Sequence, residues 1–258
     1  MKIGYRTAAF ADRPVTEALQ AIAEAGYNSV ELCLESDGLN PLELTPAKIT
    51  ELRAQLDDLG LSVAAVSYQG LEDQLEVRRQ RRYAAIDLLP QFGAPVFVVA
   101  SRREEPARLH VQWDEALQLY SELGNLCAER DCILAVEPNP GLVIRNTEDL
   151  VRALRELDHP NVGATLDVAH AAVTGDDLPW SIYQLGGRLR HLHIADIRDG
   201  VHDHLVPGTG QIDFHTLHET LDSVGYNGPA VLDMNPGPGD PAAICREALV
   251  GFRQVWSD

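Results

Sequence analysis

The sequence predicts an α/β fold of the (β/α)8 TIM-barrel class, and three observations support this prediction. Eight short apolar runs alternate with amphipathic segments from one end of the chain to the other. Most of these runs are continuously apolar, which suits parallel strands covered on both faces. Each strand-and-helix unit averages about 32 of the 258 residues, which is the size of one crossover unit.

The predicted strands follow one another at regular intervals. They cover residues 3–6, 29–34, 62–67, 96–100, 133–137, 162–167, 189–195 and 230–234. Two of the helices between them, 16–25 and 49–59, are followed by Gly26 and Gly60, the expected left-handed helix caps. No linker or low-complexity stretch interrupts the chain. We therefore expect one domain over residues 1–258.

An open, doubly wound α/β sheet is the alternative fold. It would carry a Gly-x-Gly-x-x-Gly fingerprint after its first strand. Residues Gly4-Tyr5-Arg6-Thr7 contain only one glycine. A closed barrel also leaves no sheet edges to protect, so eight strands favour the barrel.

Composition excludes several classes of function. The chain has 21 Lys and Arg against 39 Asp and Glu, a formal net charge of -18, which opposes binding to a phosphate backbone. No apolar run approaches the ~18 residues that a membrane span needs. The N-terminus also lacks an apolar signal core. We expect a cytoplasmic protein that binds neither nucleic acid nor membrane.

Polar residues end four successive apolar strands in the second half of the chain. Glu137 ends the fifth strand, Asp167 the sixth, and Asp233 lies at the end of the eighth. The seventh carries His191 and His193, which strand alternation places on one face, with His193 nearer the carboxyl end. Because catalytic groups of barrel enzymes lie where strands end, we expect these side chains to converge at the barrel mouth.

A cluster of like charges in a partly desolvated pocket needs a compensating positive charge. A divalent cation is the simplest candidate. One imidazole with several carboxylate oxygens suits Mn²⁺ best, with Mg²⁺, Co²⁺ or Zn²⁺ as alternatives, and the absence of thiolates argues against structural zinc. Glu137, Asp167, His193 and Asp233 are therefore the predicted metal ligands.

Other polar residues are expected around the same mouth. His170 follows Asp167 by three residues and can act as a second ligand or as a donor to a substrate oxygen. Arg198 can clamp an anionic or oxygen-rich group. Arg6, Glu31 and Glu35, near the ends of the first two strands, are expected to line the opposite side of the cavity.

Two motifs leave alternatives open. His202 and His204 can bind a second ion or simply be solvated on a surface loop. The glycines of Pro207-Gly208-Thr209-Gly210-Gln211-Ile212-Asp213 can bring backbone N–H groups to a ligand. Alternatively, the motif is a turn that leads to a helix N-cap at Asp213.

Taken together, four motifs in this order resemble those of a known superfamily. They are Val136-Glu137-Pro138-Asn139, Leu166-Asp167-Val168-Ala169-His170, His191-Leu192-His193-Ile194-Ala195-Asp196 and the glycine-rich Pro207–Asp213 segment. The chain resembles the xylose isomerase-like barrels, the sugar phosphate isomerase/epimerase group, which also contains inosose dehydratases, ketose 3-epimerases and endonuclease IV.

The resemblance implies Glu137, Asp167 and His193 as metal ligands and His170 as a substrate-binding residue. In the epimerases the fourth ligand is a glutamate, and two glutamates exchange protons with opposite faces of the substrate. Here the fourth position is Asp233, one methylene shorter, which changes the reach of the second base. The resemblance therefore supports the metal site more strongly than 3-epimerisation.

The favoured hypothesis is a metal-dependent isomerase or epimerase of a small sugar, keto-sugar or cyclic polyol that works through an ene-diolate. Glu137 is the expected base, Asp233 its partner on the other face, and His170, Arg198 and Arg6 the substrate-binding residues. The alternative is a dehydratase of the inosose or dehydroshikimate type. Sugar binding without turnover is a third hypothesis. Barrels of this kind often associate, so a homo-oligomer is possible.

Endonuclease IV-like DNA repair is the least favoured function. That branch of the superfamily needs histidines at the ends of the third and fourth strands. Those positions read Ser67-Tyr68 and Ala100-Ser101 in this sequence. The net charge of -18 also opposes binding to DNA.

Overall fold

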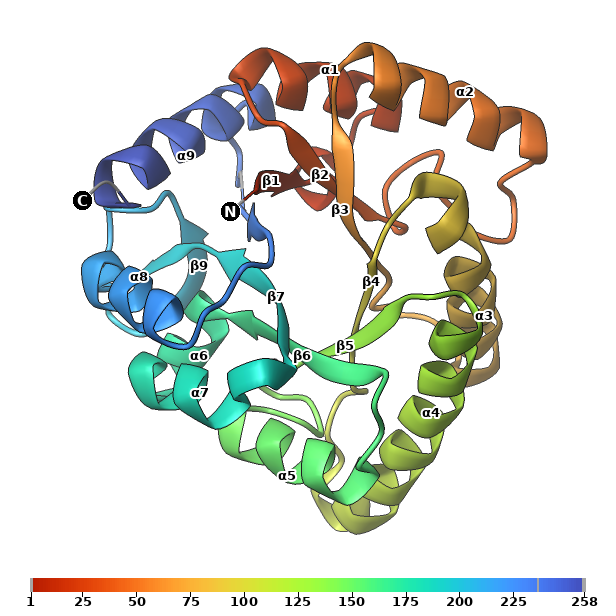
Figure 1. Ribbon diagram of the computed structural model, residues 1–258, viewed down its shortest axis with the longest axis vertical. Helices are drawn as coiled ribbons and strands as arrows, with labels where there is room; N and C mark the ends of the chain where they lie inside the picture. Colours follow the sequence, from red (N-terminus) through yellow and green to blue (C-terminus); the bar gives the residue numbers. More distant parts are fainter. Residues whose placement is uncertain (1, 236, 257–258) are drawn as a thin grey trace.

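The computed structural model describes residues 2–235 and 237–256 and shows a closed barrel of eight parallel strands. The strand order around the barrel is β1-β10-β7-β6-β5-β4-β3-β2. Helices form a ring outside the strands (Figure 1). The predicted (β/α)8 barrel is confirmed.

The barrel strands agree closely with the runs predicted from sequence. They are β1 (Ile3–Arg6), β2 (Ser29–Cys33), β3 (Ser62–Ser67), β4 (Val96–Ala100), β5 (Ile133–Glu137), β6 (Val162–Asp167), β7 (Leu189–Ile194) and β10 (Ala230–Leu232). Most of their residues are buried, as expected for strands that have a packed interior on one side and helices on the other. β2, β7 and β10 end one or two residues earlier than predicted.

The outer ring consists of helices that follow the strands along the chain. They are α1 (Val15–Ala25), α2 (Pro46–Asp58), α3 (Leu75–Phe92), α4 (Leu109–Glu129), α5 (Thr147–Leu157), α6 (Val168–Thr174), α7 (Leu178–Leu185), α8 (Phe214–Ser223) and α9 (Pro241–Trp256), with 3₁₀ turns η1 (Thr7–Phe10), η2 (Pro106–Arg108) and η3 (Gly186–Arg188). Gly26 caps α1 in the left-handed region with φ 96°. Asp213 caps α8 by accepting the Thr216 N–H, so the predicted N-cap is confirmed.

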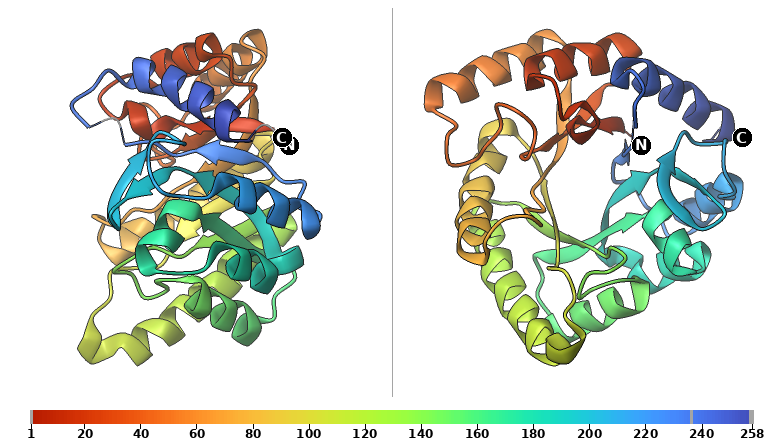
Figure 2. Two further views of the ribbon diagram at one scale, coloured as in Figure 1. Left: turned by 90° about the vertical axis from the view of Figure 1, so that its left-hand side faces the viewer. Right: turned by 180° about the vertical axis from the view of Figure 1, so that it is seen from behind.

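One element was not predicted from the sequence. Residues expected to form a polar loop after β7 instead form an antiparallel hairpin, β8 (Asp196–Arg198) and β9 (Val201–Leu205). Its turn is Asp199-Gly200, with positive φ at both residues, the geometry that matches the twist of paired strands. The Asp199-Gly200 pair was the sequence signal for this hairpin. Figure 2 shows the barrel and this segment from two further sides.

Among the described residues, no helix combines the length and apolar character that crossing a lipid bilayer requires.

Candidate active site

The polar residues predicted from the strand ends converge in the structure. Glu137 and Asp167 are the last residues of β5 and β6, His193 lies near the end of β7, and Asp233 directly follows β10. These four strands are neighbours in the barrel. The Asp233 N–H bonds the carbonyl of Ile194 at 3.1 Å, which keeps Asp233 beside β7. All four side chains are buried.

The distances within this cluster suit a bound cation. One ligand atom from each of Glu137, Asp167 and His193 lies within 4.8 Å of the others. Oδ1 of Asp167 accepts the N–H groups of Ala169 and His170 at 2.8 and 2.9 Å, whereas Oδ2 is buried without a hydrogen-bond partner. A buried carboxylate oxygen without a partner is costly. The residues therefore fit a divalent metal ion.

A second acid in the barrel interior orients His193. Glu31, on β2, accepts hydrogen bonds from Nε2 of His193 at 2.8 Å and Nε2 of His191 at 2.7 Å. The Nδ1 of His193 faces Glu137 Oε1 at 2.6 Å and lies 3.9 Å from Asp167 Oδ2. With the Nε2 proton held by Glu31, Nδ1 is the ring nitrogen available to a metal.

Arg6 balances two of these acids. Its Nη1 donates to Asp233 Oδ2 at 2.7 Å and its Nε pairs with Glu31 Oε1 at 3.0 Å. Burial alone would raise the pKa of Asp233, but Arg6, His204 and His193 lower it. Burial acts in the same direction on Glu31, and His193 and His191 hold its pKa well below the ordinary value. Arg6 does lie at the site, and its guanidinium is bound to protein carboxylates.

His204, on the β8–β9 hairpin, joins the cluster. Its Nδ1 lies 2.8 Å from the carbonyl of Asp233, to which it donates, so Nε2 points toward Asp167 Oδ2, 4.0 Å away. Ligand atoms of Asp167, His204 and Asp233 lie within 4.8 Å of one another. Burial opposes protonation of His204, but Asp167 and Asp233 raise its pKa. The sequence signal was the His-x-His spacing, which strand alternation places on one face.

His170 is buried at the same mouth. Its Nδ1 lies 3.1 Å from the carbonyl of Pro138, and its Nε2 lies 3.7 Å from Asp167 Oδ2. Ligand atoms of His170, His202 and His204 also lie within 4.8 Å of one another. Burial and the two neighbouring histidines lower the pKa of His202 to about 4. His170 therefore lies at the mouth as expected, and of the two histidines whose role the sequence left open, His204 is partly buried and His202 is exposed.

Arg198 is not brought into the cluster. Its side chain is exposed on the hairpin, and its guanidinium donates to the carbonyl of Thr209. The strand alternation of β8 buries its neighbour Ile197 and turns Arg198 outward. The structure therefore does not place Arg198 where the substrate-binding prediction requires it.

The glycine-rich segment binds a protein carboxylate. Asp196 Oδ2 accepts the N–H groups of Gly208 and Gly210 at 2.9 and 2.8 Å, and Oδ1 accepts those of Gln211 and Ile212 at 3.0 Å. A Cβ on Gly210 would lie 2.1 Å from the carbonyl oxygen of Ile197. Glycine is required there by close packing of this loop onto Asp196.

Gln69, in the loop after β3, was not predicted from the sequence as a residue of the site. Its Nε2 donates to Glu137 Oε2 at 2.8 Å, so it supports the predicted base from the side opposite His193. Glu35 holds this loop by accepting the N–H groups of Gln69 and Gly70 at 2.6 and 2.7 Å. No local pattern marks Gln69, because its partner is 68 residues away.

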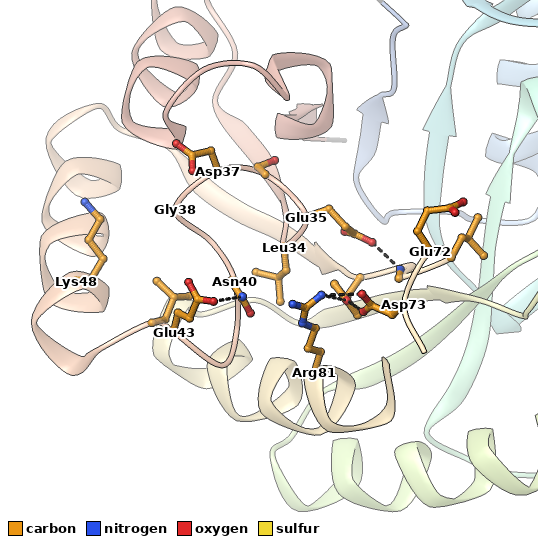
Figure 3. Close-up of a pocket in the computed structure, with 15 residues that line it drawn as sticks. Leu34, Glu35, Asp37, Gly38, Asn40, Glu43, Lys48, Glu72, Asp73 and Arg81 are labelled. Carbon is orange, nitrogen blue, oxygen red and sulfur yellow. Dashed lines mark hydrogen bonds and ion pairs between the residues drawn. The ribbon is translucent and has the colours of Figure 1, made fainter. Parts of the chain in front are cut away.

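The loops after β2 and β3 also enclose a recess of about 590 Å³. Figure 3 shows the Glu35 carboxylate pointing toward the loop that carries Glu72, with Lys48 on the opposite wall. The charged residues that line it are Glu35, Asp37, Glu43, Glu72, Asp73, Lys48 and Arg81. Acids outnumber cations, and the recess opens at the end of the barrel where the carboxyl ends of the strands lie.

Comparisons with known proteins agree with the barrel fold. Residues 19–254 match the family described as xylose isomerase-like TIM barrel. A 3-dehydro-D-guloside 4-epimerase of Escherichia coli is 27% identical over 273 residues, covering 98% of this chain and 99% of that protein. An inosose dehydratase of Geobacillus thermodenitrificans is 26% identical over 223 residues, covering 72% and 74%. The crystal structure of the IOLI protein with a bound zinc atom superposes with a TM-score of 0.85 at 17% identity, covering 100% and 98%.

Proposed function

The chain belongs to the xylose isomerase-like TIM-barrel family, and we propose that it is a divalent-metal-dependent isomerase or epimerase of a small sugar, keto-sugar or cyclic polyol. The observation that carries the proposal is the buried Glu137, Asp167 and His193 cluster, in which Asp167 Oδ2 has no partner. The epimerase and dehydratase names of its relatives support the same class of chemistry.

Glu137, Asp167, His193 and Asp233 would hold the metal, with His204 as a further nitrogen donor. A bound divalent cation supplies Lewis-acid polarisation of a substrate carbonyl and its neighbouring hydroxyl, which makes the α-carbon proton removable. This mixture of carboxylates and imidazole suits Mn²⁺ better than it suits a metal that prefers thiolate ligands. The ligands are buried, so water is largely excluded from the site.

Glu137 is assigned as the base that removes the α-carbon proton. Its Oε2 is oriented by Gln69 and its Oε1 lies beside His193, so the carboxylate is held in one position. Asp233, which directly follows β10, is assigned to the second proton transfer. His170 would accept a hydrogen bond from a substrate hydroxyl through Nε2, because its Nδ1 carries the proton that it donates to the carbonyl of Pro138.

One observation favours dehydration as the second candidate function. Arg6 binds Asp233 Oδ2 at 2.7 Å and lowers its pKa, which disfavours the protonated form that returns a proton to carbon. A dehydratase uses the same first proton abstraction and then expels a β-hydroxyl. It therefore needs no proton return to carbon from this residue.

The acidic recess supports an uncharged substrate. Five carboxylates and two cations line it, so a phosphorylated sugar would meet net negative charge there. We accordingly propose a sugar or polyol without phosphate as the substrate, with the non-reacting part of the molecule in the recess. The chain's net charge of -18 supports a protein that does not bind nucleic acid, and we propose that it is cytoplasmic. A homo-oligomer remains part of the proposal.

The test is proton exchange in D₂O with the Mn²⁺-loaded protein and a panel of ketoses, keto-glycosides and inososes. Deuterium at the α-carbon of a substrate, lost on chelation of the metal, is the expected result. Absorbance of an enone in the same reactions would identify the dehydratase. If a sugar binds equally well with and without metal and exchanges no deuterium, the protein binds sugar without turnover and the proposed function is wrong.

A further inference from the structure

A second cavity lies on the outside of the barrel. It has a volume of about 230 Å³, below the ~300–1,000 Å³ of typical drug-sized pockets, and suits a small metabolite. Its walls come mainly from α3 and α4, which lie side by side in Figure 1, and from the residues after β4. It is separate from the acidic recess, with which it shares no lining residue.

Two buried arginines of α3 line this cavity without a carboxylate partner. Arg78 is 5% exposed and Arg82 is 1% exposed, and within the described residues neither forms an ion pair. They donate instead to main-chain carbonyls: Arg78 Nε to Gln69 at 2.6 Å and Arg82 Nη2 to Ala100 at 2.7 Å. Burial lowers the pKa of both, that of Arg82 to about 9. Buried charge without a counter-charge is unusual.

Two buried donors at this cavity also lack acceptors. In the part of the chain that the structure describes, Nε of Arg82 and the hydroxyl of Tyr120 have no hydrogen-bond partner, and Tyr120 is 1% exposed. Tyr120 lies close enough to Arg78 and Arg82 to influence the pKa of each. Buried polar groups without partners usually mark a missing water, ion or ligand.

The charged residues of the cavity indicate that its ligand is negatively charged. Four arginines line it, Arg78, Arg79, Arg82 and Arg102, against two glutamates, Glu115 and Glu122. Both glutamates are already paired at the rim, Glu122 with Arg79 at 2.5 Å and Glu115 with Arg102 at 3.0 Å. The inner surface therefore keeps a positive excess in a chain whose net charge is -18.

We propose that this cavity is a binding site for a small organic anion, a phosphate or carboxylate compound, held by Arg78, Arg82 and Tyr120. The anion accepts from Arg82 Nε and the Tyr120 hydroxyl, and its charge offsets the two arginines. Leu75, Ala116 and Leu119 provide an apolar wall for the carbon skeleton of the ligand.

Occupancy of this site is expected to affect the active site. Arg78 and Arg82 both hold the carbonyl of Gln69, at 2.6 and 3.2 Å, and the Gln69 side chain holds Glu137. An anion that draws the guanidinium groups toward itself weakens their hydrogen bonds to Gln69. Gln69 then holds Glu137, the proposed base, less firmly. This consequence rests on the proposed function, whereas the anion site itself does not.

Calorimetric titration of the Mn²⁺-loaded protein with inorganic phosphate, and separately with succinate, tests the site. Tyr120→Phe is the main variant, because the hydroxyl has no protein partner and its removal leaves the fold intact. It should weaken binding of the preferred anion about tenfold, the effect of one charge-assisted hydrogen bond. Arg82→Met should abolish binding. The anion that binds more tightly, phosphate or succinate, shows whether the site prefers a phosphate or a carboxylate compound.

Two controls separate this site from other arginines and from the metal. Arg145→Gln changes an exposed arginine that does not line the cavity and should leave affinity unchanged. Asp167→Asn removes a proposed metal ligand. If this variant binds the anion with unchanged affinity, the anion does not bind to the metal. No binding to the wild type, or equal affinity in wild type and Tyr120→Phe, overturns the proposal and leaves a cavity that holds water only.

The activity arm measures kcat for deuterium exchange with and without saturating anion. We expect a change in kcat for the wild type, and in Tyr120→Phe the same change should need an anion concentration about tenfold higher. An unchanged kcat in the wild type overturns the coupling to Gln69. If the wild type has no exchange activity, the proposed function fails, and the titration still decides the anion site.

Discussion

The two halves of the barrel contribute differently to one site. The strands β5, β6, β7 and β10 supply all four predicted metal ligands, Glu137, Asp167, His193 and Asp233. The strands β1 and β2 and the loop after β3 supply Arg6, Glu31 and Gln69, each of which contacts one or more of those ligands. The first half thus holds the ligands that the second half provides.

This difference shows how the acidic cluster is tolerated in a buried position. Arg6 lies between Glu31 and Asp233, and Glu31 in turn orients His193. Arg6 and Glu31 therefore balance the charge and fix the position of the predicted ligands without being predicted ligands themselves. Substitutions on the two sides should have different signatures: loss of metal and activity for the ligands, and loss of stability or rate for the supporting residues.

The largest expected effect is on the ligand side. Asp167→Asn keeps the Oδ1 acceptor that caps α6 and replaces only the unpartnered Oδ2, so the fold should be preserved. Activity should fall at least about a thousandfold because Lewis-acid chemistry contributes several kcal/mol. Bound metal measured by mass spectrometry should fall with it. Asp213→Asn, at the cap of α8, is the matched control, and equal metal content in both variants would contradict the ligand assignment.

On the supporting side, Arg6→Met should cost stability. It leaves Glu31 and Asp233 buried without their cation, which typically costs about 3 kcal/mol. Urea unfolding of the metal-free protein measures the change. Arg13→Met removes an exposed pair with Asp240 and should cost less than about 1 kcal/mol. Similar losses in the two variants would show that Arg6 does not balance the cluster.

Gln69→Leu should lower kcat about tenfold with little change in stability. It removes the hydrogen bond to Glu137 Oε2 and leaves the ligands in place, and supporting contacts of this kind are worth about 10–100-fold. Gln80→Leu, which removes a bond to Glu76 within α3, is the control. If the Gln69 variant kept the full kcat, the hydrogen bond from Gln69 would not be what orients Glu137.

The acid side of the stability profile should reflect the same contacts. The pKa values of Glu31, Asp167 and Asp233 are all lowered in the folded protein. Such carboxyls stabilise the fold above their unfolded pKa of about 4, and this contribution is lost as pH falls through the lower folded values. The free energy of unfolding of the metal-free protein should therefore decrease below about pH 4. Asp233→Asn should show a shallower decrease, and parallel profiles would refute this account.

The smallest effect is expected for Arg198→Ala. Its side chain is exposed and bonded to the carbonyl of Thr209, so kcat/KM should stay within about threefold of the wild type. Steady-state kinetics on the substrate found by exchange decides the point. An increase in KM above about tenfold would restore Arg198 as a substrate-binding residue that the hairpin carries to the mouth.

The barrel and the convergence of the polar residues at the strand ends could be predicted because both depend on local patterns. Continuous apolar runs such as Val96–Ala100 mark strands covered on both faces. Residues that end neighbouring parallel strands share one edge, so Glu137 and Asp167 had to meet. The hairpin was harder to predict, because its strands are short and polar, although the Asp199-Gly200 pair was a signal for its turn.

The sequence by itself therefore determined the fold class, the mouth of the barrel and the acidic cluster that suits a cation. Only the tertiary structure decided which side chains meet: Arg6 with Asp233 across 227 residues of sequence and Gln69 with Glu137 across 68. It also decided that Arg82 meets the carbonyl of Ala100 and no carboxylate of the described residues. The physical reason is that hydrophobic periodicity is set residue by residue along the chain. Pairing of distant side chains depends on closure of the barrel and on the register between its strands.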